Sequence, residues 1–137
     1  MRLLSFLIIF LMLLSCKTDK KETPLKNNVM PQRGELSWES QIFLGNRLFS
    51  EKTCITCHDV HKSTIGPSVK EIMDVYQAKN GDIFAFLKGR AKPIVDTTPE
   101  QVAIMQANID GFLQEISDEE LQTIATYMQH VDDINPD

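Results

Sequence analysis

The hydrophobic residues of the chain fall into three zones: an apolar run at the N-terminus, a polar stretch, and a longer region with helical periodicity. The run at 3–14 is apolar apart from Ser5 and follows the positive charge of Arg2. A run of about 12 residues is too short to span a bilayer, which needs roughly 20, and is typical of the core of an export signal. We therefore expect that residues 1–15 form a signal peptide.

The polar stretch at 16–34 contains Pro24, Pro31 and many charges, and it shows neither helical nor strand periodicity. It begins at Cys16, which follows the small residue Ser15. This arrangement resembles a bacterial lipoprotein signal, in which such a cysteine is lipidated and becomes the mature N-terminus. The resemblance implies a lipid on Cys16 and a flexible tether at 17–34 with a reach of about 23 Å. An ordinary signal peptide that is cut elsewhere is the alternative.

The pattern from residue 35 onward predicts helices and no strand. Helices are expected between Ser37 and Ser50, from Val69 to about Lys79 after an N-cap at Ser68, and over a short segment that Asp82 opens. Thr98, Pro99 and Gln101 have the order of an N-cap, a first-turn proline and a capping box, which predicts a short helix ending near Met105. A capping box at 117–120 opens a terminal helix. The apolar positions assigned to the longer helices are Trp38, Ile42, Phe43, Phe49, Val69, Ile72, Met73, Tyr76, Leu121, Ile124, Ala125, Met128 and Val131.

Composition and length restrict the function to that of a small globular protein. The chain has 137 residues, of which 42% are hydrophobic and 24% charged, as in ordinary globular domains. The formal net charge of −5 argues against a nucleic-acid partner. Residues 35–137 therefore form one all-α domain, small and with long polar loops. Because these helices offer no obvious dense core, we expect that something other than side chains fills the middle.

The segment Cys54-Ile55-Thr56-Cys57-His58 is the attachment signature for c-type haem. Two thiols at this spacing can add to the two vinyl groups of one porphyrin, and the adjacent imidazole can reach the iron. A zinc site would need further ligands, and only His61 and His130 remain beyond this segment. A thioredoxin-like pair would need a βαβ context, which is not predicted. One haem on Cys54 and Cys57 and a lipid on Cys16 account for all three cysteines.

With this motif the chain resembles a class I cytochrome c from Trp38 to Val131. The resemblance implies that Gly45 and Phe49 on the first helix pack against Tyr127 on the last. It also implies that Gly66 and Pro67 contact the haem site, where the proline carbonyl accepts the second N–H of His58. The fold implied is a small helical domain wrapped around one covalently attached haem.

The sixth iron ligand of this family is a methionine shortly before the terminal helix, and Met105 matches that position. It ends a predicted short helix and precedes Ser117 by 12 residues. Met73 and Met128 lie on apolar helical stripes, so they are predicted to be core residues. His61 and His130 are predicted to be exposed. A buried methionine under the loop is the alternative interpretation of Met105.

Ligation by His58 and Met105 leaves no open position on the iron, which favours one-electron transfer by Fe(III)/Fe(II) cycling over conversion of a substrate. The expected partners are a redox donor and a redox acceptor of the bacterial envelope, with the haem domain in the periplasm. Lysines such as Lys52 and Lys88 could form a basic ring around the haem edge, although a scattered solvated surface is the favoured interpretation. Two alternative functions remain: a gas sensor or peroxidase-like subunit with a labile sixth ligand, and a fixed haem subunit of a larger oxidoreductase.

Overall fold

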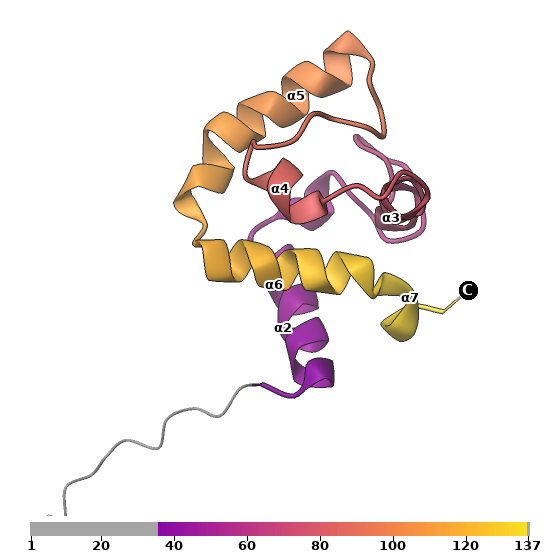
Figure 1. Cartoon of the computed structure of the whole chain (residues 1–137), viewed down its shortest axis with the longest axis vertical. Helices are drawn as coiled ribbons and strands as arrows, with labels where there is room; N and C mark the ends of the chain where they lie inside the picture. The colour runs from indigo at the N-terminus through magenta and orange to yellow at the C-terminus, as the bar shows by residue number, and fades with distance from the viewer. Residues whose placement is uncertain (1–35, 137) are drawn as a thin grey trace, which may run out of the picture. The chain divides into compact units, whose positions relative to one another are not determined.

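The computed structural model describes residues 36–136, and the predicted all-α class is confirmed there. The export signal, Cys16 and the tether lie outside the described residues. No strand occurs within 36–136, where an isolated bridge joins His58 to Ser63. None of the helices in this range has the length and apolar content needed to cross a bilayer. In chain order the elements are α2 (Trp38–Glu51), η1 (Cys54–Thr56), α3 (Val69–Ala78), α4 (Ile83–Leu87), α5 (Pro99–Asp110), η2 (Phe112–Glu115), α6 (Asp118–Gln129) and α7 (Val131–Ile134) (Figure 1).

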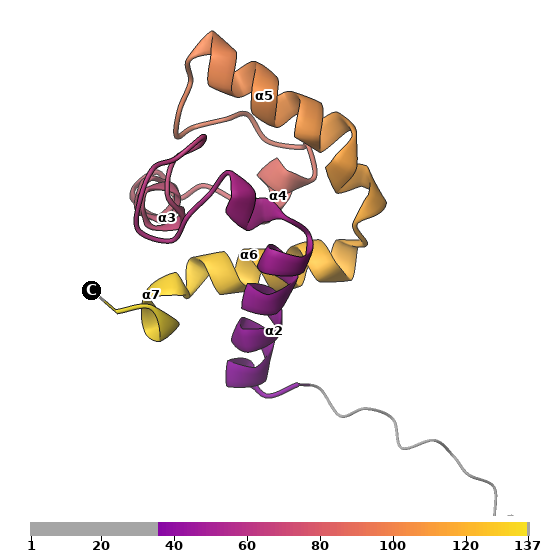
Figure 2. The same ribbon diagram turned by 180° about the vertical axis from the view of Figure 1, so that it is seen from behind.

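Helices α2 and α6 cross in close contact, as both views show (Figures 1 and 2). The crossing depends on Gly45, because a Cβ there would lie 2.3 Å from the Thr123 carbonyl oxygen and 2.5 Å from Cβ of Tyr127. Phe49 meets Tyr127 edge to face, with ring centroids 5.4 Å apart. The predicted contact of Gly45 and Phe49 with Tyr127 is therefore confirmed.

Not all of the apolar residues that the sequence places on α2 are buried. Trp38 and Phe43 are exposed, at 53% and 61%. The buried face of α2 consists of Ile42, Gly45, Leu48 and Phe49. This face follows from the crossing at Gly45, which selects the positions three and four residues away on the same side of the helix. Trp38 instead packs edge-on against His130, with ring centroids 4.6 Å apart.

Helices α3 and α4 begin where the sequence predicts. Ser68 caps α3 through a capping box with Glu71, and Asp82 caps α4 by accepting from the Ala85 N–H. The predicted apolar side of α3 is buried in full and consists of Val69, Ile72, Met73 and Tyr76. These two helices therefore form with their expected faces toward the interior.

Helix α5 begins at Pro99 as predicted, but its capping and its length differ from the prediction. Thr98 makes no side-chain cap; its hydroxyl donates to Asp96 instead. The side chain of Gln101 donates to a distant carbonyl, so no capping box forms. The helix also continues past Met105 to Asp110, because the polar residues at 106–108 are tolerated on its solvent side and no breaker precedes Gly111.

The terminal helix begins as predicted and ends earlier. Ser117 and Glu120 form the expected capping box at the start of α6. The helix stops at Gln129, so Val131 belongs to the separate turn α7. All the apolar positions predicted from Leu121 to Val131 are buried, as is Tyr127, which is 1% exposed.

Candidate functional site

A largely apolar cleft lies among α3, α4, α5, α6 and the η1 turn. It encloses about 1300 Å³, part of which is open to solvent. Its apolar lining includes Ile72, Ile83, Leu121 and Ile124, which come from three different helices. The middle of the domain is therefore not filled by side chains alone, as the sequence predicts.

The Cys54–His58 segment forms one edge of this cleft. The N–H of Cys57 and that of His58 both donate to the Cys54 carbonyl, at 3.2 and 3.0 Å, so the segment is a single tight turn. Thr53 precedes the turn in the left-handed conformation, with φ of 60°. This turn brings both thiols and the imidazole to the same cleft. The thiols of Cys54 and Cys57 are free and do not form a disulfide.

Burial raises the pKa of the Cys54 thiol to about 11. The thiol is therefore protonated at neutral pH, unlike the low-pKa thiolate of a reactive redox pair. Within 36–136, no group of three or more His, Cys, Asp and Glu side chains is placed to hold a metal ion. The raised pKa disfavours the redox-pair alternative, and the lack of a ligand cluster in the described range disfavours the zinc alternative.

His58 is fixed by two contacts from the loop at 64–67. Its Nδ1 lies 2.8 Å from the Pro67 carbonyl oxygen, and since a carbonyl can only accept, Nδ1 carries the proton. Nε2 of the neutral ring is therefore an available electron-pair donor. Gly66 lies flat against the ring, because a Cβ there would approach Cε1 of His58 to 2.6 Å. The structure thus contains the predicted Pro67–His58 hydrogen bond and explains why position 66 is glycine.

Met105 reaches the same cleft from α5, where it is half-buried. Met128 also lines the cleft from α6 and is 4% exposed, so its assignment to the core alone is incomplete. Met73 is buried on α3 and is not part of the lining. Among the methionines of the described range, two are therefore candidates for a ligand opposite His58.

Neither of the other two histidines lines the cleft. His61 is exposed, as predicted. His130 is only partly exposed, because it lies between Trp38 and the Asp133 carboxylate, 2.9 Å from Nδ1. His130 is thus less exposed than predicted, and its separation from the cleft agrees with the sequence prediction.

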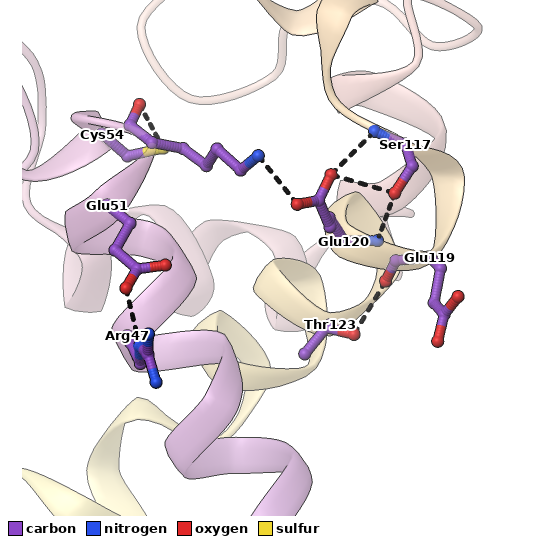
Figure 3. Close-up of polar contacts among 8 residues, drawn as sticks. Arg47, Glu51, Cys54, Ser117, Glu119, Glu120 and Thr123 are labelled. Carbon is purple, nitrogen blue, oxygen red and sulfur yellow. Dashed lines mark hydrogen bonds and ion pairs between the residues drawn. The ribbon is translucent and has the colours of Figure 1, made fainter.

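The turn that carries Cys54 is connected to the start of α6 by charged side chains (Figure 3). Lys52 Nζ lies 2.7 Å from Glu120, and Lys88 pairs with Asp118 in the same first turn of α6. The Lys52 ammonium and the Ser117 N–H together lower the pKa of the Glu120 carboxyl to about 2. Two lysines of the expected basic ring are therefore paired within the protein.

Gln101 is a residue of the site, although the sequence predicts that it completes a capping box. Its Nε2 donates to the Ile65 carbonyl at 3.0 Å, and it lines the cleft one helical turn before Met105. The bond spans 36 residues, so local sequence carries no signal for it. The same holds for the pairing of Lys52 with Glu120.

Residues 43–132 match the family model described as Cytochrome c. A comparison with curated proteins found no match. Because the matched range covers more than half of the chain, the chain belongs to the cytochrome c family. It is therefore a haem-based electron-transfer protein, an electron carrier rather than an enzyme in its own right. The predicted family is confirmed.

Members of this family hold haem c covalently, and Cys54, Cys57 and His58 fit the attachment motif. The structure accommodates such a group. Two free thiols and an imidazole with an available Nε2 lie at the edge of a cleft whose lining is mostly apolar. The residues that would hold the haem are therefore Cys54, Cys57 and His58, and the predicted cofactor is confirmed.

Proposed function

We propose that the protein carries single electrons between redox proteins of a bacterial envelope, and that His58 and Met105 would be the two residues that ligate the haem iron. The observation that carries this proposal is the placement of His58 and Met105 on separate elements that line one apolar cleft. Met105 is preferred to Met128 because α5 directly precedes η2 and the terminal helix, which is the family's ligand position.

The bound haem supplies a one-electron Fe(III)/Fe(II) couple, and the side chains determine how that couple behaves. Pro67 accepts the Nδ1 proton of His58, which orients the ring and increases the basicity of Nε2. The thioether of Met105 is a soft donor that favours the ferrous state and raises the reduction potential. Apolar side chains such as Ile72 and Ile124 exclude water and disfavour the more highly charged ferric state. Ligation by both residues leaves no position for a substrate.

The ligand assignment is tested by comparing Met105→Leu with Met128→Leu in the haem-loaded protein. Both methionines line the cleft, and leucine conserves most of their volume. The weak long-wavelength ferric band of methionine–iron ligation should disappear in Met105→Leu and persist in Met128→Leu. The reduction potential should fall in the first variant only, because the soft ligand is lost there.

Other results would overturn this assignment. Loss of the band in Met128→Leu alone would move the ligand to α6. A high-spin wild-type spectrum would remove the methionine ligand and favour a haem-based gas sensor or a peroxidase-like subunit. Isolation of the protein in a stoichiometric complex with an oxidoreductase would favour a fixed haem subunit over a diffusing carrier.

The proposal includes a lipid on Cys16 that anchors the chain to an envelope membrane, with the haem domain in the periplasm. It is supported by the apolar run at 3–14 that ends just before Ser15 and Cys16. In cells fed labelled palmitate, the full-length chain should carry the label and sediment with membranes. Cys16→Ser should carry no label. A labelled Cys16→Ser variant, or an unlabelled wild type, would overturn lipidation at this residue.

A further inference from the structure

Helix α5 carries Met105 but contributes little to the core. Of its 12 residues, Ile109 alone is fully buried, whereas α3 buries four of its 10 residues. Ile104 is 41% exposed and Met105 is half-buried toward the cleft. In both ribbon views α5 lies on the far side of the unit from α2 (Figures 1 and 2). Burial of α5 in the protein interior is therefore a weak restraint on the position of Met105.

A hydrogen bond joins α5 to the loop that holds His58. Gln101 Nε2 donates to the Ile65 carbonyl at 3.0 Å, and Ile65 directly precedes Gly66 and Pro67. Gln101 and Met105 are four residues apart, so they lie on the same face of α5. The bond therefore acts one helical turn from Met105 and reaches the loop on the opposite side of the cleft.

The loop that carries the Ile65 acceptor is held in place by further hydrogen bonds. The Gly66 N–H donates to the Cys57 carbonyl at 2.9 Å, and the Thr64 hydroxyl donates to the same oxygen at 2.8 Å. Ser63 also hydrogen-bonds to Glu71 at the start of α3. The donor side of the bond, on α5, is less restrained. A polar hollow lined by Ser63, Thr64 and Asp96 lies beside Gln101, so water can compete for the Gln101–Ile65 hydrogen bond. Loss of the bond would therefore release α5 rather than the loop.

We propose that Gln101 is a positioning residue, which holds α5 against the Ile65 carbonyl and thereby limits how readily another ligand replaces Met105 on the iron. The inference rests on the proposed axial role of Met105. In the exchange, the bond from the Met105 sulfur to the iron breaks, a bond from the incoming ligand forms, and no electron is transferred. Without the Gln101–Ile65 bond, conformations in which α5 has moved away are more populated, so the incoming ligand binds more tightly.

The test is titration of the ferric, haem-loaded full chain with imidazole, followed through loss of the methionine–iron band. Gln101→Ala removes the donor while keeping a strong helix former. Gln106→Ala is the matched control, because Gln106 lies on the same helix and donates only one turn ahead, to Asp110. Gln101→Lys restores a donor that can reach Ile65. At about pH 8 imidazole is mostly neutral, so the added lysine charge has little effect on its affinity.

Gln101→Ala should bind imidazole about three- to tenfold more tightly than the wild type, the range that corresponds to one hydrogen bond. Its α5 amides, at 99–110, should also exchange hydrogen faster. Gln106→Ala and Gln101→Lys should stay within about twofold of the wild type. Equal imidazole affinities in Gln101→Ala and Gln106→Ala would overturn this inference but leave the proposed function standing. A wild type without the methionine band before titration would overturn the proposed function, and this inference with it.

Discussion

Within 36–136, two residues other than glycine adopt the left-handed backbone conformation, and only one of them is suited to it. Thr53 has φ of 60° and Asn80 has φ of 49°. Asparagine tolerates this region, whereas a β-branched residue is strained there. The Thr53 side chain is exposed and makes no capping hydrogen bond, so little is lost by replacing it. Thr53→Asn should therefore raise the free energy of unfolding by about 1 kcal/mol.

The reciprocal change supplies the control for this prediction. Asn80 ends α3 in the same conformation, so Asn80→Thr should lower the free energy of unfolding by about the same amount. Urea unfolding of the haem-loaded variants measures both changes. Shifts of the same sign would show that backbone strain at Thr53 does not govern the effect.

At the residue scale, the sequence predicts those parts of the site that are close together in the chain. Cys54, Cys57 and His58 belong to one turn, so their spacing alone encodes their chemistry. Gln101 could not be assigned in this way, because its partner Ile65 is 36 positions away. The pattern around it favoured the local capping role, and the long-range hydrogen bond forms in its place.

At the element scale, three helix ends meet at the start of α6. Lys52 is the C-cap of α2 and Lys88 is the C-cap of α4, and they pair with Glu120 and Asp118. Cations at helix C-termini and anions at a helix N-terminus each complement the helix dipole. The two ion pairs therefore join favourably charged helix ends. The Lys52–Glu120 pair connects the Cys54 turn to α6, and the Lys88–Asp118 pair connects α4 to α6.

Glu120→Gln tests the electrostatic part of this connection. Glutamine can still complete the capping box with Ser117, so the change removes mainly the pairing with Lys52. The pKa of the Glu120 carboxyl is lowered from 4.5 to about 2 by Lys52 and Ser117. A lowered pKa means that the stabilisation is fully present above about pH 4.5 and is lost as the pH falls toward 2. Glu120→Gln should thus be less stable than the wild type at pH 7, and the difference should vanish toward pH 2.

The measurement is denaturant unfolding of both proteins at several pH values across this window. Glu119→Gln is the control, since Figure 3 draws no contact to the Glu119 carboxylate. A difference between Glu120→Gln and the wild type that is independent of pH would mean that the Lys52–Glu120 pair is not its source.

The beginnings of helices were easier to predict than their ends. Ser68, Asp82 and Ser117 cap α3, α4 and α6 through hydrogen bonds that are encoded within four residues. The end of α5 depends instead on where the chain must turn toward η2, at Gly111. The polar residues after Met105 predict the end of the helix, although a helix with one side in solvent tolerates them equally well.

At the scale of the whole molecule, the described domain is more acidic than the full chain. Residues 36–136 contain eight Lys and Arg against fifteen Asp and Glu, a formal net charge of −7. No Lys or Arg occurs after Lys92, and that part of the chain contains Met105 and the whole of α5 and α6. Lys52 and Lys88, two residues of the basic ring considered from the sequence, are also paired with carboxylates, so the charges on α5 and α6 are mainly negative.

This charge distribution predicts how fast small redox reagents exchange electrons with the haem. Oxidation of the ferrous protein by a cationic cobalt(III) complex should slow about two- to tenfold as ionic strength rises from roughly 0.01 to 0.15 M, because salt screens the attraction. Oxidation by the ferricyanide anion should accelerate over the same range. Glu100→Gln, at the start of α5, should weaken both dependences more than Glu39→Gln at the far end of α2. Both side chains are exposed, but Glu100 is next to Gln101 in the cleft lining, whereas Glu39 is ten positions from Phe49, the α2 residue that lines the cleft. Acceleration with the cationic reagent would instead assign the electron-transfer edge to the neighbourhood of Lys62, Arg90 and Lys92.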